Sequence, residues 1–191
     1  MTAARYDPVS LRAAATLLDA EPVAFSALPD GLAFDEDLQR NIAARYGEPD
    51  DSYRFEPIEL PVSVLLGSLP ADTRELARQI TVRGAAFYSD LDAAWRRAYR
   101  REIAAYRREH RRVNPFDIDC DYPDGERRRR IVERYVAELR AGRPLTPIVI
   151  DLHNLDGGPM PGVDLLDGYH RFAAHLLAEA HLIRCLSLLP E

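Results

Sequence analysis

The stretch Val163-Asp-Leu-Leu-Asp-Gly-Tyr-His-Arg-Phe-Ala-Ala-His-Leu-Leu177 decides the fold. An apolar run ends in Asp-Gly, and a His-Arg pair follows before a pattern rich in alanine and leucine. Apolar runs bounded by turn residues indicate strands, whereas apolar residues three and four apart indicate a helix. We therefore predict a strand over 163–166, a tight turn, and a helix over 169–180.

The turn at Asp167, Gly168, Tyr169, His170 and Arg171 has the chemistry of a phosphate site. The first turn of a helix offers backbone N–H groups without helical partners and the positive end of the helix dipole. Gly168 allows the backbone to approach a ligand closely, and His170 and Arg171 add side-chain donors. The same pattern also fits a simple turn into a helix, so both interpretations stay open on these residues alone.

Outward from this turn, helical and extended patterns alternate toward the C-terminus. We predict a helix over 124–140 that ends at Gly142, strands over 145–151 and 182–189, and a loop over 153–162. The earlier chain is mainly helical, with predicted helices over 8–20, 35–46, from 72 and from 89 to about 112, and a strand or extended edge segment over 56–66 that contains two prolines. The sequence thus predicts an α+β core over 113–191, preceded by a helical extension over 1–112 that packs on it.

Three segments carry a family resemblance: Thr146-Pro-Ile-Val-Ile-Asp151, Asp167-Gly-Tyr-His-Arg-Phe-Ala-Ala174 and His181-Leu-Ile-Arg-Cys-Leu-Ser-Leu188. In this order they resemble the ParB/sulfiredoxin-like superfamily over residues 113–190. The resemblance implies a small mixed sheet with helices that binds a nucleotide. It also implies that the backbone of Gly168, Tyr169 and His170, with the side chains of His170 and Arg171, holds phosphates of ATP, ADP or CTP.

Departures from the family pattern narrow the expected activity. Sulfiredoxins need a cysteine where this chain has Tyr169. A tyrosine cannot perform their thiol chemistry, so sulfiredoxin activity is excluded. Segregation ParB proteins carry a C-terminal helix-turn-helix module, for which we expect no room after the strand ending at residue 189. The box Gly125-Glu-Arg-Arg128 resembles a ParB motif, but no apolar strand precedes it, so we interpret it as an ordinary helix start with solvated arginines.

The resemblance is therefore most compatible with the small-molecule kinases of the superfamily. We expect an ATP- or ADP-dependent phosphotransferase or an NTPase, with a nucleotide, a small-molecule phosphate acceptor and Mg²⁺. The alternative is a non-catalytic module that senses a nucleotide or associates with DNA through the arginine-rich helix over 96–112.

Phosphoryl transfer needs a carboxylate to orient the acceptor and to help hold a metal. The candidates are Asp119, Glu126 and Asp151, and the sequence does not rank them. Neither His153 nor His175 has a histidine or cysteine partner at a zinc spacing such as His-x3-His or Cys-x2-Cys.

Composition excludes several other functions. All 25 basic residues are arginine, so no lysine can form a Schiff base or bind phosphate in a P-loop. The net charge of −6 argues against nonspecific DNA binding. No apolar run approaches the roughly 18 residues of a membrane span, and the N-terminus lacks a signal core. We expect a cytoplasmic protein, and a homodimer is compatible with the sequence.

Overall fold

The computed structural model describes residues 14–29, 32, 35–90, 97, 125–152 and 163–189. Expectations for other residues, including Asp119 and the arginine-rich helix, lie outside this part of the chain. The fold is mixed α+β, as the sequence predicts. The elements follow in the order β1 (Thr16–Leu17), β2 (Val23–Ala24), the 3-10 helix η1 (Phe25–Ala27), α2 (Glu36–Tyr46), β3 (Arg54–Pro61), α3 (Val62–Ser68), α4 (Ala71–Arg83), α6 (Gly125–Arg140), β4 (Ile148–Asp151), β5 (Asp164–Asp167), α7 (Tyr169–Leu177) and β6 (Leu182–Leu189).

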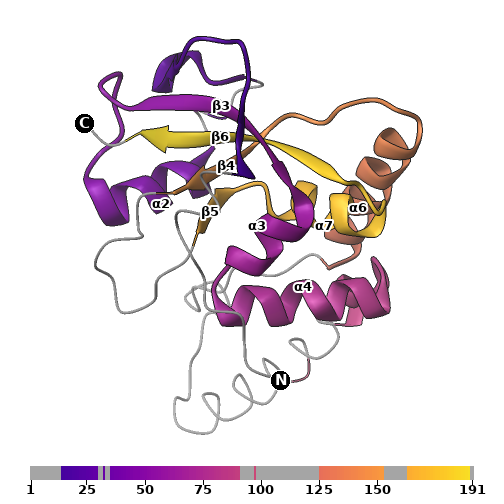
Figure 1. The fold of residues 1–191 in the computed structure, drawn as a ribbon. Helices are drawn as coiled ribbons and strands as arrows, with labels where there is room; N and C mark the ends of the chain where they lie inside the picture. The colour runs from indigo at the N-terminus through magenta and orange to yellow at the C-terminus, as the bar shows by residue number, and fades with distance from the viewer. Residues whose placement is uncertain are drawn as a thin grey trace, which may run out of the picture.

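One mixed sheet, in the order β1-β3-β6-β4-β5, runs through the described part of the molecule, and β2 also pairs with β3 (Figure 1). Strands β3 and β6 are antiparallel along their whole length, from Arg54 opposite Leu189 to Pro61 opposite Leu182. Strand β4 runs parallel to β6, and β5 is antiparallel to β4. The sheet therefore joins segments that lie more than a hundred residues apart in the sequence.

This sheet corrects the expected division at residue 112. The three strands β1, β2 and β3 precede that residue, yet they belong to the same sheet as β4, β5 and β6. A core that began at residue 113 would lack β3, which pairs with β6 over its full length. The segment before residue 113 is therefore not a helical extension alone, because it supplies one of the sheet's interior strands.

Two local expectations also differ from the structure. Within the helix expected over 8–20, Thr16 and Leu17 form a strand opposite Glu59 and Ile58, so tertiary pairing overrides the helical spacing of the leucines. Strand β3 contains Pro57 although it is not an edge strand. The proline is accommodated because it falls between the short pairings that β1 and β2 make with β3.

Helices cover both faces of the sheet. On one face, Ile148, Ile150 and Ile183 pack with Phe172 of α7, together with residues of α3 and α4. On the other face, Val149 and Leu166 pack against Leu38 and Ile42 of α2. Helix α6 packs in turn on α7 through Val132, Ala173 and Ala174, so α7 is buried between the sheet and a second helix.

Capping residues fix the ends of several of these helices. The Asp35 carboxylate accepts a hydrogen bond from the Leu38 backbone N–H at 2.9 Å at the start of α2. After α6, the N–H of Gly142 donates to Leu139 O, and the N–H of Arg143 donates to Glu138 O. This pair of bonds is a Schellman motif with Gly142 at φ 73°, which confirms the predicted stop at that glycine.

Gly168 joins β5 to α7 in a left-handed conformation, with φ 102° and ψ 24°. A Cβ atom on this residue would lie 2.6 Å from Cγ2 of Ile148, which is fully buried in β4. The backbone therefore needs glycine for two reasons, the positive φ and the close approach to a neighbouring strand. Gly168 fixes where the first turn of α7 lies relative to the sheet.

We expect Gly168→Ala to lower the free energy of unfolding by roughly 3 kcal/mol, the sum of an unfavourable φ and a steric clash. The matched control is Gly142→Ala, where φ is 73° and nothing lies within 4 Å of the added Cβ. That control has only the conformational cost of about 1 kcal/mol. Urea denaturation of both variants measures the difference, and equal losses would show that contact with Ile148 imposes no constraint.

Candidate functional site

A pocket of about 260 Å³ lies between α4 and α7. Its walls are mostly apolar, and a histidine and an arginine stand among them. The lining residues are Thr73, Leu76, Ala77 and Ile80 of α4, Tyr169, His170, Phe172, Ala173 and Leu176 of α7, and Phe87, Tyr88 and Arg128. The sequence-predicted residues Tyr169 and His170 thus face a pocket that also includes residues from two other parts of the chain.

The start of α7 is polarised to attract an anion. The first bond of the helix runs from the Phe172 N–H to Gly168 O at 2.8 Å, so the N–H groups of His170 and Arg171 precede the helical bonding pattern. No side chain caps this end of the helix, and its first turn carries no acidic residue. The nearest carboxylate, Asp167, precedes the helix and is paired with Arg171, so the helix itself supplies no acidic side chain to offset the positive end of its dipole.

Arg171 has a different partner from the phosphate expected for it. Its guanidinium donates to the Asp167 carboxylate at 2.5 Å, and these side chains are 12% and 19% exposed, respectively. Its Nε atom is buried, with no partner in the described part of the chain. Neither Asp167 nor Arg171 lines the pocket. The two residues thus pair with each other across the turn, and the arginine that lines the pocket is a different residue.

The arginine that lines the pocket is Arg128 of α6. Its side chain is exposed and lines the pocket beside His170, and no hydrogen bond or ion pair joins it to another described residue. Arg128 cannot be told from its neighbours in the sequence, because four consecutive arginines occupy residues 127–130. Only the packing of α6 on α7 selects which of the four faces the pocket.

His170 lies in an environment that disfavours its charged form. Its ring centroid is 5.6 Å from that of Tyr88. Burial lowers the pKa of His170, and the nearby Arg128 lowers it further, while Asp167 acts in the opposite direction. Burial also raises the pKa of Tyr88 to about 12. Both rings are therefore neutral at pH 7 and contribute hydrogen-bonding atoms rather than charge.

Glu126 and Asp151, two of the three candidate catalytic carboxylates, lie in different parts of the structure. Glu126 accepts a hydrogen bond from Ser89 Oγ at 2.6 Å and pairs with Arg129 at 3.0 Å. Ser89 follows the pocket residue Tyr88 in the chain, while Glu126 itself does not line the pocket. Asp151 is fully buried in β4 and accepts a hydrogen bond from the Tyr46 hydroxyl of α2.

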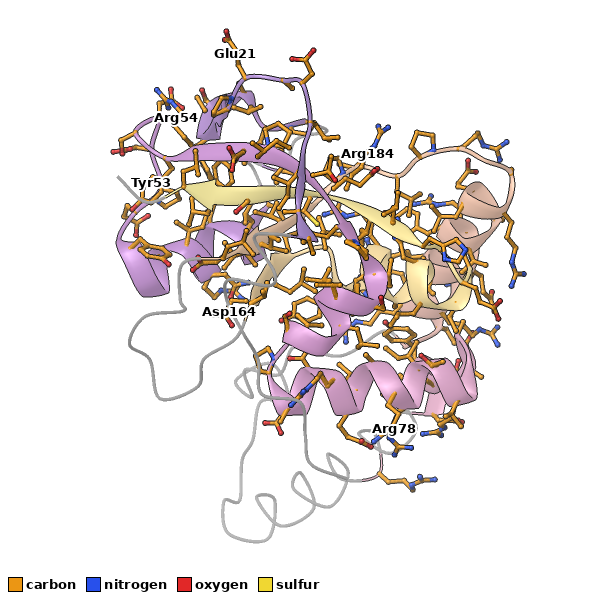
Figure 2. The ribbon with its side chains drawn as sticks, in the orientation of Figure 1. Glu21, Tyr53, Arg54, Arg78, Asp164 and Arg184 are labelled. Atoms are coloured by element: carbon orange, nitrogen blue, oxygen red, sulfur yellow. The ribbon has the colours of Figure 1, made fainter. Side chains whose placement is uncertain are left out.

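Asp151 therefore faces the opposite side of the sheet from α7. Its strand neighbours are Leu188, which packs with α2, and Asp164 of β5, which Figure 2 shows near α2. Of the three carboxylates, Glu126 is bonded to the chain neighbour of a pocket residue and Asp151 lies away from the pocket, while Asp119 lies outside the described residues.

Comparison with models of protein families, with curated proteins and with solved structures finds no match. Within the described ranges, no group of three or more histidine, cysteine or acidic residues is arranged to hold a metal ion. None of the helices in the same ranges is both long and apolar enough to cross a membrane. The functional assignment consequently depends on the geometry of this pocket and on the sequence of its turn.

We expect Arg128→Gln to raise the pKa of His170 toward its ordinary value of 6.5, because one of the causes that lower it is removed. In the unmodified protein the folded-state pKa lies below the unfolded value. The unfolded chain therefore binds the proton more readily, and stability falls as the pH drops below about 6.5.

An NMR titration of the His170 ring measures this pKa directly. Arg130→Gln is the matched control, because Arg130 is exposed on the same helix but does not line the pocket. An unchanged pKa in Arg128→Gln, or an equal change in the control, would contradict the placement of Arg128 beside His170.

Proposed function

We propose that this chain binds a nucleotide, with a phosphate group at the start of α7 and an apolar part of the ligand in the adjoining pocket. The observation that carries the proposal is the convergence of an uncapped helix start, an exposed arginine and an apolar pocket on one side of α7. Phosphates bind well at helix N-termini and to arginine, and small-molecule sites are mostly apolar with a few placed polar groups.

Each part of the pocket has a proposed role. The backbone N–H groups of His170 and Arg171 would donate to phosphate oxygens, and Arg128 would add a charge-assisted bond from α6. Leu76 and Ile80 of α4, with Phe87, would cover an aromatic base or a sugar face. The ion pair of Asp167 and Arg171 would position the turn without touching the ligand.

The resemblance to the ParB/sulfiredoxin-like superfamily supports this proposal. The order of strand, glycine turn, helix and strand in β5, Gly168, α7 and β6 is the order that the resemblance implies. In one respect the proposal departs from the family pattern, because it assigns the phosphate-facing cation to Arg128 rather than to Arg171.

Phosphotransferase or NTPase activity is a further part of the proposal, and it rests on Glu126. Its carboxylate is bonded to Ser89, the chain neighbour of the pocket residue Tyr88, and would orient an acceptor hydroxyl or water. No second carboxylate joins it in a metal-binding group within the described residues, so we derive no step through Mg²⁺. The non-catalytic alternative is favoured by one observation, that Glu126 already binds Ser89 and Arg129.

Calorimetric titration with ATP, ADP and CTP, each with Mg²⁺, tests the binding proposal. We expect binding by the unmodified protein and an affinity lowered roughly tenfold by Arg128→Gln, because one charge-assisted bond is lost. Arg130→Gln removes the same charge from the same helix and should leave the affinity unchanged. Absence of heat with every nucleotide, or equal effects of the two substitutions, would refute the site.

The same samples separate an enzyme from a sensor. If the protein transfers or hydrolyses phosphate, Glu126→Gln should abolish turnover and keep nucleotide affinity. A protein that binds a nucleotide but releases no product, with or without candidate acceptors, supports the sensing function.

A further inference from the structure

A second pocket, of about 270 Å³, lies toward the other end of α7 and shares no lining residue with the first. It forms because β6 extends beyond β4: Ile148 of β4 pairs with Cys185, while Leu182, Ile183 and Arg184 pair with β3. The chain between α6 and β4 passes this open stretch of β6, and Figure 2 shows Arg184 near that connection.

His175 presents a hydrogen-bond acceptor to this second pocket. The residue is only 7% exposed, and its Nδ1 lies 2.7 Å from the Arg171 carbonyl oxygen. Because a carbonyl only accepts, Nδ1 must carry the proton and donate it. Burial lowers the pKa of His175, so the ring is neutral and its Nε2 holds a free lone pair. No other described residue bonds to that nitrogen, and His175 lines the pocket.

Arg184 supplies a cation to the same pocket. Its side chain is 55% exposed, and its Nε lies 3.8 Å from a Glu59 oxygen, which is too long for a hydrogen bond. The other arginine in the pocket wall, Arg143, already donates to Glu138. Arg184 therefore keeps most of its hydrogen-bonding capacity for a ligand, and Glu59 places a negative charge next to it.

The remaining walls are aliphatic. Leu139, Leu145 and Leu182 line the pocket, and Leu182 is 50% exposed. An exposed leucine is ordinary by itself, but here it adjoins a fixed acceptor and an incompletely paired arginine. The pocket thus combines an apolar wall, the paired Arg143, the incompletely paired Arg184 with Glu59, and one neutral acceptor on the buried His175.

We propose that this second pocket binds a small aliphatic carboxylate that carries a hydroxyl or ammonium donor on the carbon next to the carboxylate. The carboxylate binds Arg184, the donor binds Nε2 of His175, and the alkyl chain covers the three leucines. An ammonium donor would additionally face Glu59. This site is independent of the nucleotide proposed at the start of α7.

Three compounds with the same carbon skeleton test the proposal in the full chain without nucleotide: L-leucine, L-2-hydroxy-4-methylpentanoate and 4-methylpentanoate. The first has an ammonium donor, the second a hydroxyl and the third neither. We expect at least one of the first two to shift the His175 Nε2 resonance in NMR titrations, and the third to bind roughly ten times more weakly, since it leaves Nε2 unpaired. Comparison of the first two identifies the donor.

Arg184→Gln should weaken binding roughly tenfold, because the carboxylate loses its cation. Arg184 is exposed, so this substitution leaves the core intact, and Arg130→Gln serves as the control for lost charge. The proposal is overturned by no shift at up to about 50 mM, a range that covers millimolar affinities. It is equally overturned if the third compound binds as well as the others, or if Arg184→Gln binds as the unmodified protein does.

Discussion

The close approach of Gly168 to Ile148 is the constraint on which the rest of the site depends. A left-handed glycine, with no side chain to separate it from β4, lets the chain turn from β5 into α7 within one residue. The turn is then held by the ion pair between Asp167 and Arg171, which spans it from strand to helix. A mostly buried pair of this kind contributes more to defining one conformation than to net stability, since both charges lose solvation. The start of α7 is therefore placed by backbone geometry, and its N–H groups are oriented before any ligand arrives.

The elements near the turn were predictable because their signals are local. The stop at Gly142, the start of α2 at Asp35 and the run of strand, turn, helix and strand from 163 to 189 all depend on residues close together in the sequence. The pairing of β3 with β6 was not predictable in this way. It joins residues 54–61 to residues 182–189, and no spacing within either segment specifies the other.

The candidate site was predictable only in part, for a similar reason. The turn and His170 were predictable from the sequence. Arg128 was not, because the sequence does not indicate which of four consecutive arginines lines the pocket beside α7. The role of Arg171 had a visible signal, since Asp167 precedes it by four residues, a spacing that favours an ion pair. The two histidines of α7 differ as well. His170 is half-buried beside Tyr88 and Arg128, whereas His175 is buried and its Nδ1 donates a hydrogen bond to its own helix. The contacts of His170 depend on residues that are close in space but distant in the sequence, so the sequence alone does not predict them.

The most direct test of the central claim is to observe the backbone amides of α7 while inorganic pyrophosphate is added. Pyrophosphate carries the proposed phosphate chemistry without a base, so it isolates the helix start from the apolar wall. We expect the largest amide shifts in an NMR titration at His170 and Arg171, with smaller changes along β4 and β6. Shifts concentrated on other arginine-rich surfaces, with the start of α7 unaffected, would contradict the central claim.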